Sequence, residues 1–282
     1  MTAKEVTAAA LDWAKASGDI WARRWADTDA ALAGLSPHLL AAICAAPPHG
    51  SFKAFEIGCG PGSTTLDVAE ACPAAEIVAC DISASLAAIA AQRLAGHPGV
   101  RVVVGDAQAL APAEAPIDFI FSRHGVMFFE DPVRAFTSLR SATSAGGRLV
   151  FSCFRSWELN PWASELASAA AGRTVAAPGR EPGGFAFADP EYVSDILASA
   201  GWSDAKADAV DFTYHAAEGQ GATASALSFL SELGPAARIL ESFDGEERSA
   251  GLERMQRIIE GRFDGRAVAF PAAAWIWSAS AG

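Results

Sequence analysis

Three regularly spaced acidic residues are the first sign of chemistry in this sequence. Glu56, Asp81 and Asp106 each come at or just after the end of a short apolar run, and the same interval of 25 residues separates each from the next. That interval suits one strand followed by one helix, which would place the three carboxylates at the carboxyl ends of neighbouring parallel strands. Open α/β folds bind their ligands at this edge of the sheet.

A glycine-rich loop follows the first acid. Gly58, Gly60 and Gly62 lie between a predicted strand and a helix that begins near Ser63. Glycines let the backbone turn sharply and approach a ligand closely, which is typical of nucleotide-binding loops. A dinucleotide fingerprint would need glycine or alanine at Ser63. Glu56 beside the loop would disfavour a pyrophosphate and suit the ammonium group of an amino acid; a structural turn without a ligand is the alternative.

The other two acids suit a nucleoside. Asp81 can accept hydrogen bonds from both hydroxyls of a ribose. Asp106 offers a carboxylate to an exocyclic amine, and a backbone N–H just after it can meet a ring nitrogen, which together are the contacts that adenine needs. Ile82 and Leu86 can supply apolar faces for the ring. The alternatives are a helix N-cap for Asp81 and a solvated loop aspartate for Asp106.

A histidine follows the fourth apolar run, just after Phe121. His124 is the one imidazole expected near this site, and it can serve as a base if the substrate is a hydroxyl or a protonated amine. Alternatively, His124 packs against the substrate or forms a hydrogen bond to the cofactor. Ser122 and Arg123 should face the same ligand, with Arg123 positioned either for a carboxylate or for a structural ion pair.

The elements that must position these residues alternate between strands and helices. Strand-length apolar runs, each followed by a helical stretch, occupy residues 52–57, 76–80, 101–104, 118–122 and 148–154. Two further strand candidates, residues 206–214 and 267–279, enclose a helical block at 222–262. Residues 5–46 predict two or three amphipathic helices, and Asp189 with Pro190 predicts an N-cap for a helix that ends near Ala200. The alternation predicts a doubly wound α/β sheet.

Composition excludes several functions. The chain has 282 residues, of which 51% are hydrophobic, and its formal net charge of −12 would repel nucleic acid. Five cysteines without metal-site spacing indicate reduced thiols and no metal. Neither a signal peptide nor an apolar run of roughly 18 residues is recognisable, so we expect a cytoplasmic protein without a membrane span.

Together these motifs resemble the class I S-adenosylmethionine-dependent methyltransferases, and within them the UbiE-like small-molecule branch. The resemblance covers most of the chain from about residue 52 onward. It is carried by residues 56–62, 81, 105–108, 121–129, 146–149, 160–162, 185–190 and 271–275. A joint match of this kind is far more specific than one glycine loop.

The resemblance implies a Rossmann-like, seven-stranded, mostly parallel sheet with helices on both faces and a helical lid. The final strand, residues 267–279, would be antiparallel and inserted by a hairpin-like return. Residues 1–50 would form the lid, and residues 51–282 the methyltransferase domain, with insertions at about 155–188 and 222–262. Trp13, Gly18 and Trp21 resemble the spacing of a lid segment that often closes over the methionine end of the cofactor; core packing is the alternative.

The implied cofactor is S-adenosylmethionine, with S-adenosylhomocysteine as its product. The expected cofactor-binding residues are Trp21, Glu56, Gly58, Cys59, Gly60, Gly62, Asp81, Ile82, Leu86, Asp106, Ala107, Gln108, Ser122 and Arg123. Because the transferred methyl group is already activated, the protein mainly aligns the acceptor, which is worth up to about 7 to 11 kcal/mol. His124 is the candidate catalytic residue, although the resembling branch commonly has phenylalanine there.

An aromatic cover predicts a small, apolar or aromatic acceptor in a site that closes to exclude water. Its expected members are Trp25, Trp157, Trp162, Phe185, Phe187 and Phe229, each of which lid packing would also explain. An NAD-dependent oxidoreductase is one alternative function, disfavoured because neither tyrosine precedes a basic residue by one helical turn. A non-catalytic S-adenosylmethionine-binding protein is another. The sequence leaves the oligomeric state open, with a homodimer as one alternative.

Overall fold

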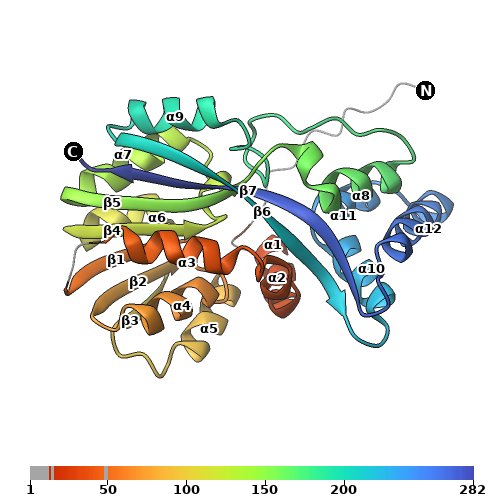
Figure 1. The fold of residues 1–282 in the computed structure, drawn as a ribbon, viewed down its shortest axis with the longest axis horizontal. Helices are drawn as coiled ribbons and strands as arrows, with labels where there is room; N and C mark the ends of the chain where they lie inside the picture. The colour runs from red at the N-terminus through yellow and green to blue at the C-terminus, as the bar shows by residue number, and fades with distance from the viewer. Residues whose placement is uncertain (1–12, 14–15, 48–49) are drawn as a thin grey trace.

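A seven-stranded sheet forms the centre of the computed structural model, which describes residues 13, 16–47 and 50–282. The strand order is β3-β2-β1-β4-β5-β7-β6 (Figure 1). The strands are β1 (Phe52–Ile57), β2 (Ala75–Asp81), β3 (Val100–Val104), β4 (Ile117–Arg123), β5 (Thr143–Phe154), β6 (Ser203–Glu218) and β7 (Ala267–Ser280). The strand β7 lies between β5 and β6 and runs antiparallel to both. The other strand pairs are parallel. The predicted Rossmann-like sheet with an inserted final strand is confirmed.

Helices cover both faces of this sheet, as predicted (Figure 1). One face carries α3 (Ser36–Ala45), α4 (Ser63–Ala71) and α5 (Ala84–Arg93), and the other carries α6 (Ala107–Glu114), α7 (Pro132–Ala142) and α9 (Pro190–Ser199). The predicted N-cap of α9 is confirmed, because Asp189 accepts backbone N–H bonds from Glu191 and Tyr192.

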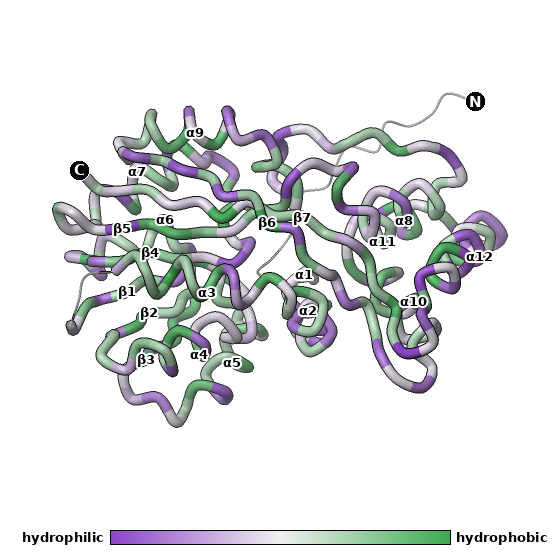
Figure 2. Tube along the Cα trace, viewed as in Figure 1, coloured by the Kyte–Doolittle hydropathy of each residue, from purple (hydrophilic) through white to green (hydrophobic). Residues whose placement is uncertain are grey.

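The strands β6 and β7 extend well beyond the sheet as a two-stranded ribbon (Figure 1). This ribbon and the adjacent loops carry α8 (Pro161–Ala171), α10 (Ala222–Glu232), α11 (Pro235–Glu241) and α12 (Gly245–Gly261). The last three of these helices, α10, α11 and α12, form the block predicted at residues 222–262. Figure 2 shows hydrophilic residues along the outer turns of α12, as expected for the rim of the molecule.

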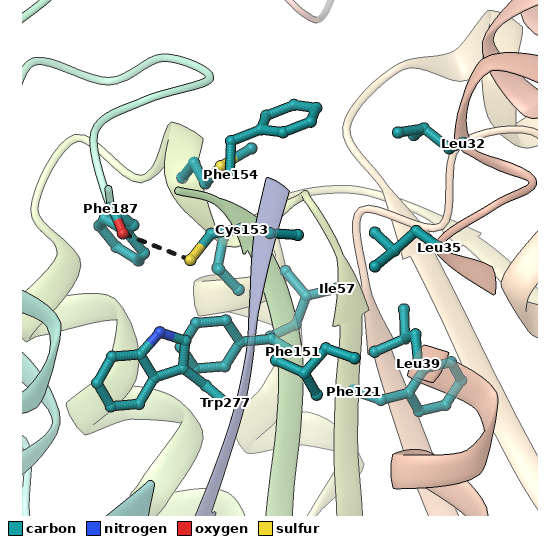
Figure 3. Close-up of a cluster of buried hydrophobic side chains, with 14 of the residues drawn as sticks. Leu32, Leu35, Leu39, Ile57, Phe121, Phe151, Cys153, Phe154, Phe187 and Trp277 are labelled. Atoms are coloured by element: carbon teal, nitrogen blue, oxygen red, sulfur yellow. Dashed lines mark hydrogen bonds between the residues drawn. The ribbon is translucent and has the colours of Figure 1, made fainter. Parts of the chain in front are cut away.

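The amino-terminal helices include α1 (Ala16–Arg23) and α2 (Trp25–Leu32) as well as α3. Leu35 and Leu39 are almost fully buried beside Phe121 and Ile57, whereas Phe187 and Trp277 lie on the opposite side of the strands (Figure 3). The segment before β1 therefore contributes to the main core. The division of the chain into a lid and a catalytic domain at residue 50 stays a prediction.

Within the described part of the chain, no single helix has the length and apolar character needed to cross a membrane. The pair α2 and α3 meets that requirement only when the two are counted together, and a bend of 75° separates them.

Candidate functional site

The three acidic residues meet at one edge of the sheet. Glu56 is the second-last residue of β1, Asp81 is the last residue of β2, and Asp106 follows β3 by two residues. In the parallel register, Ile57 pairs with Cys80, and Asp81 pairs with Val104. The predicted clustering at the carboxyl ends of the strands is therefore present, although the three side chains lie in different environments.

Glu56 is buried beneath the rim. Its carboxyl group accepts a hydrogen bond from the hydroxyl of Thr65, and the side chain is 1% exposed. Burial raises the pKa of Glu56 to about 8, against the opposing effects of the Thr65 hydrogen bond and the nearby charge of Arg123. A cation brought next to this carboxyl group would favour its ionised form.

The glycine loop needs its glycines. Gly58, Gly60 and Gly62 have φ angles of 63°, 55° and 83°, all in the left-handed region. A Cβ on Gly58 would lie 3.2 Å from the Cα of Gly125, whereas a Cβ on Gly60 would meet nothing within 4 Å. The loop therefore packs tightly against the end of β4 and leaves open space at its tip. The Cys59 side chain points inward, into a small apolar cluster.

Asp81 fixes this loop in place. One carboxylate oxygen accepts the backbone N–H of Gly60 and the other accepts that of Ser83, each at 2.8 Å. Burial raises the pKa of Asp81, while these two hydrogen bonds oppose the shift. Each oxygen keeps a lone pair, so the carboxylate can still accept hydrogen bonds from a ligand.

Asp106 is exposed and is the N-cap of α6, because it accepts the backbone N–H of Gln108 at 2.9 Å. The helix cap that was the alternative for Asp81 thus occurs at Asp106, and Ser83 is the cap of α5. The neighbouring predicted residues differ in exposure: Leu86 and Ala107 are buried, Gln108 is half-buried and Ile82 is 45% exposed.

The two predicted residues at the end of β4 bind other protein groups. Ser122 is fully buried; its hydroxyl donates to the Ile57 carbonyl at 2.7 Å and accepts the Gly125 N–H at 3.2 Å. Arg123 forms an ion pair with Asp29 of α2 at 2.8 Å. Of the two alternatives for Arg123, the structure has the ion pair.

The predicted lid segment lies over the same edge of the sheet. Trp13 packs on Trp21 and on Phe128, with ring centroids 5.4 and 4.7 Å apart. A Cβ on Gly18 would come within 2.5 Å of the Ser83 hydroxyl, so α1 lies directly against the start of α5. Gly18 and Trp13 thus lie near the ends of β2 and β4, and the role of this segment as a lid stays a prediction.

His124 is buried and held on several sides. It has a left-handed φ of 61°, its Nδ1 lies 2.7 Å from the Ser152 hydroxyl, and its ring meets Phe154 edge to face at 4.1 Å. Its Nε2 is buried with no hydrogen-bond partner among the described residues. Burial, followed by the charge of Arg123, lowers the pKa of His124 to about 3, so the imidazole is neutral at physiological pH.

Aromatic rings continue outward from His124. Phe154 contacts Trp162 and Phe185, and a chain of stacked rings leads on to Tyr214 and Phe229. We call the following residues the aromatic cluster: Phe154, Trp157, Trp162, Phe185, Tyr214 and Phe229. Four of the six predicted wall residues belong to it.

The other two predicted wall residues lie elsewhere. Phe187 lies beside Phe151 (Figure 3) and also packs against Phe136 of α7. Trp25 lies against the guanidinium of Arg93. A solvent-open hollow of about 400 Å³ between α2, α3 and α4 shares only Arg123 with the predicted site residues. It is therefore distinct from the region around His124.

Sequence reasoning missed three residues of the site. Asp29 reaches Arg123 across 94 positions of sequence, so no local pattern could have shown the pair. Ser152 lies inside β5, and nothing in the local sequence distinguishes it from any other small residue of a buried strand. Tyr214 had a signal, since it follows Phe212 by two positions in an alternating strand pattern, but its stacking on Trp162 depends on the ribbon of β6 and β7.

Known methyltransferases are similar to this chain in sequence and in fold. Residues 55–151 match the family model of a methyltransferase domain. The chain is 32% identical over 109 residues to malonyl-[acyl-carrier protein] O-methyltransferase 1 of Ilyobacter polytropus, which covers 38% of this chain and 40% of that protein. It is 32% identical over 126 residues to trans-aconitate 2-methyltransferase of Azoarcus sp.. That match covers 41% of this chain and 48% of the relative. The matches thus span less than half the length of either relative.

Among solved structures, phosphoethanolamine N-methyltransferase 2 of Haemonchus contortus in complex with S-adenosyl-L-methionine superposes with a TM-score of 0.52. That likeness covers 93% of this chain and 56% of the other at 15% identity, and it supports the fold. The glycine loop, the ordered acids and the family match agree with one another. Residues 55–151 thus form a methyltransferase domain, and the chain is similar to the class I S-adenosylmethionine-dependent methyltransferases of the small-molecule, UbiE-like type.

Proposed function

We propose that this protein transfers a methyl group from S-adenosylmethionine to a small, apolar or aromatic metabolite by direct in-line displacement. One relationship supports this most strongly. Gly125 packs against Gly58 of the glycine loop, while the ring of the preceding residue, His124, packs on Phe154 of the aromatic cluster. A cofactor on the loop and an acceptor against the cluster would meet at the end of β4.

The residues around the glycine loop fit the cofactor. The open space beside Gly60 leaves room for a ligand, and both oxygens of Asp81 have a lone pair to spare. When bound, S-adenosylmethionine supplies a methyl group already activated by the sulfonium. Glu56 would hold the ammonium group and Asp81 the ribose hydroxyls, and Asp106 would bind the adenine amine.

The remaining predicted residues would shape or support the cofactor site. Ile82, Leu86 and Ala107 would flank the adenine, and Trp21 would cover the methionine end. Gly58, Cys59 and Gly62 would shape the loop, and Ser122 would hold β4 to β1. The Gln108 N–H already binds Asp106, so Gln108 would contact the adenine with its side chain. Arg123 would set the charge next to Glu56.

His124 would contact the acceptor, since its Nε2 has no hydrogen-bond partner among the described residues and its ring packs on Phe154 of the aromatic cluster. Proton removal from the acceptor and hydrogen bonding to it are the two roles open to this nitrogen. A pKa lowered to about 3 means that any proton taken up would be weakly held, which disfavours the base.

The wider setting agrees with a small-molecule enzyme. A net charge of −12 disfavours nucleic acid as the acceptor, and five free cysteines suit a cytoplasmic location. Nothing in the family match supports the NAD-dependent alternative, and Ser63 begins α4 where a third glycine would be needed. The homodimer stays a prediction.

The test is methyl transfer itself. Purified protein is incubated with S-adenosylmethionine labelled on its methyl group and with mixtures of small aromatic and aliphatic metabolites, and labelled products are identified by mass spectrometry. We expect label in at least one small acceptor and its loss in an Asp81→Ala variant. Tight S-adenosylhomocysteine binding without any labelled product across broad mixtures would instead favour a non-catalytic binding protein.

A further inference from the structure

We infer that Ser152 holds His124 in the tautomer that carries its proton on Nε2, so that His124 donates a hydrogen bond to an oxygen atom of the acceptor. This inference rests on the proposed function, because it specifies the chemistry of the same acceptor site. The acceptor class that follows is an apolar or aromatic compound with a carboxylate or carbonyl oxygen at or beside the methylated atom.

The hydrogen bonds at Ser152 indicate the tautomer. Its hydroxyl is fully buried, and His124 Nδ1, at 2.7 Å, is its one hydrogen-bond partner in the described chain. If the hydroxyl donates to Nδ1, the imidazole proton is on Nε2, and that N–H is the one group left unpaired. If Nδ1 carries the proton, both the serine hydrogen and the Nε2 lone pair are buried without partners. Buried polar groups are paired where they can be, so the first arrangement is favoured.

The imidazole is also fixed in direction. The His124 N–H binds the Ser152 carbonyl at 3.1 Å, so β5 holds both the backbone and the ring of this residue. Phe154 limits rotation of the ring from the other side. A left-handed φ is uncommon outside glycine, and such conformations gather at functional sites. These contacts aim Nε2 in one direction without satisfying it.

A fixed, neutral N–H selects among acceptors. It binds carboxylate, carbonyl or phenolate oxygens and offers nothing to an ammonium group. An acid acceptor also needs no base: a carboxylate oxygen attacks the methyl carbon with its own lone pair, the carbon–sulfur bond breaks with its electrons going to sulfur, and no proton has to leave. The neutrality of His124 suits this chemistry, and the aromatic cluster suits an apolar body next to the oxygen.

The tautomer is measured directly by ¹⁵N NMR of histidine-labelled protein with S-adenosylhomocysteine bound. His124→Phe identifies the His124 signals among the five histidines. We expect a protonated Nε2 and an unprotonated Nδ1 with no titration between about pH 5 and pH 9. Ser152→Ala should lose this preference and Ser152→Thr, which keeps the hydroxyl, should retain it. A wild-type proton on Nδ1, or identical spectra for Ser152→Ala and wild type, would overturn the inference.

The acceptor class is tested with two probes of similar shape, phenylacetate and phenethylamine. We expect phenylacetate to shift the Nε2–H signal and phenethylamine to leave it unchanged. For the natural acid or ketone acceptor, His124→Phe should raise KM at least tenfold, and His124→Gln, which keeps an N–H donor, should recover part of the loss. A shift with the amine alone contradicts the inference. Failure of S-adenosylhomocysteine to bind would instead contradict the proposed function, and the NMR result decides the tautomer whether or not either probe reacts.

Discussion

Asp29 of α2 binds Arg123 at the end of β4, 2.8 Å away, and the same carboxylate binds Arg93 of α5 at 3.0 Å. Arg93 in turn donates to the Pro61 carbonyl in the glycine loop. One acidic residue of the amino-terminal helices thus connects the loop, β4 and α5. Because Arg123 is the cation that opposes the raised pKa of Glu56, this connection also bears on the charge of the cofactor site.

We expect Asp29→Asn to lower the free energy of unfolding by about 2 to 3 kcal/mol, because two arginines lose a mostly buried partner. Urea denaturation measures the change. Asp208→Asn is the matched control, since its ion pair with Lys206 is exposed on both sides and should matter by less than about 1 kcal/mol. Equal effects of the two substitutions would show that the connection through Asp29 is not structural.

The buried carboxyl group of Glu56 should make the stability of the folded protein depend on pH. Burial raises its folded-state pKa from 4.5 to about 8, so the folded protein holds this proton more tightly than the unfolded chain does. Its contribution to stability is therefore greatest below pH 4.5 and is lost as the pH rises toward about 8. Relative to wild type, Glu56→Gln should gain stability across this window and then level off. A constant difference between the two proteins in thermal unfolding from pH 5 to 8 would contradict the shift.

Cofactor binding should be linked to the same proton. An ammonium group beside Glu56 favours the carboxylate, so binding of S-adenosylhomocysteine should release a proton and become tighter as the pH rises from about 6 to about 8. Calorimetry in buffers of different ionisation enthalpy measures the release. The Glu56→Gln variant should bind more weakly and without this linkage. Wild-type binding that takes up a proton would place the ammonium group elsewhere.

Gly60 offers a test of cofactor position. Gly60→Ala adds a methyl group where the structure has open space, at the cost of about 1 to 2 kcal/mol for a left-handed alanine. We expect it to weaken S-adenosylhomocysteine binding more than tenfold. Gly219→Ala is the control, because Gly219 also has a positive φ and open space but lies in the loop between β6 and α10. Similar stability loss in both variants with unchanged binding in both would remove the ligand from the loop.

Two phenylalanines in one segment separate the acceptor site from the core. Phe185 and Phe187 are both almost fully buried, but Phe185 joins the aromatic cluster and Phe187 packs beneath the sheet. Substitution by leucine should destabilise each variant by about 1 to 2 kcal/mol. Steady-state kinetics should show a raised acceptor KM for Phe185→Leu alone. A raised KM in Phe187→Leu and not in Phe185→Leu would relocate the acceptor.

Local pattern predicted most of the sheet. Phe52–Ile57 was found with the same bounds because a buried parallel strand is a short, continuous apolar run between clear turns. The strand predicted at residues 206–214 extends over Ser203–Glu218, because the residues at its two ends lack a clear apolar pattern. The first residues of β5 were missed for a similar reason, since Ser144 and the two glycines after it do not look like a strand.

The sequence predicted where the site lies on the sheet, but not the contacts of its individual side chains. Regular spacing placed the acids at one edge, but it could not show that Glu56 is buried under Thr65 whereas Asp106 caps a helix in solvent. Those differences depend on the packing of the helices, because α4 brings Thr65 onto Glu56 whereas Asp106 lies beyond β3 at the start of α6. The same limit explains Phe187, whose strand and loop neighbours direct it to the face opposite Phe185.

Cofactor binding at the glycine loop is tested most directly by a calorimetric titration of the wild-type protein with S-adenosylhomocysteine and, separately, with NAD. We expect micromolar, one-to-one binding of S-adenosylhomocysteine, greatly weakened in Gly60→Ala, and no binding of NAD. Micromolar binding of NAD with none of S-adenosylhomocysteine would contradict this expectation.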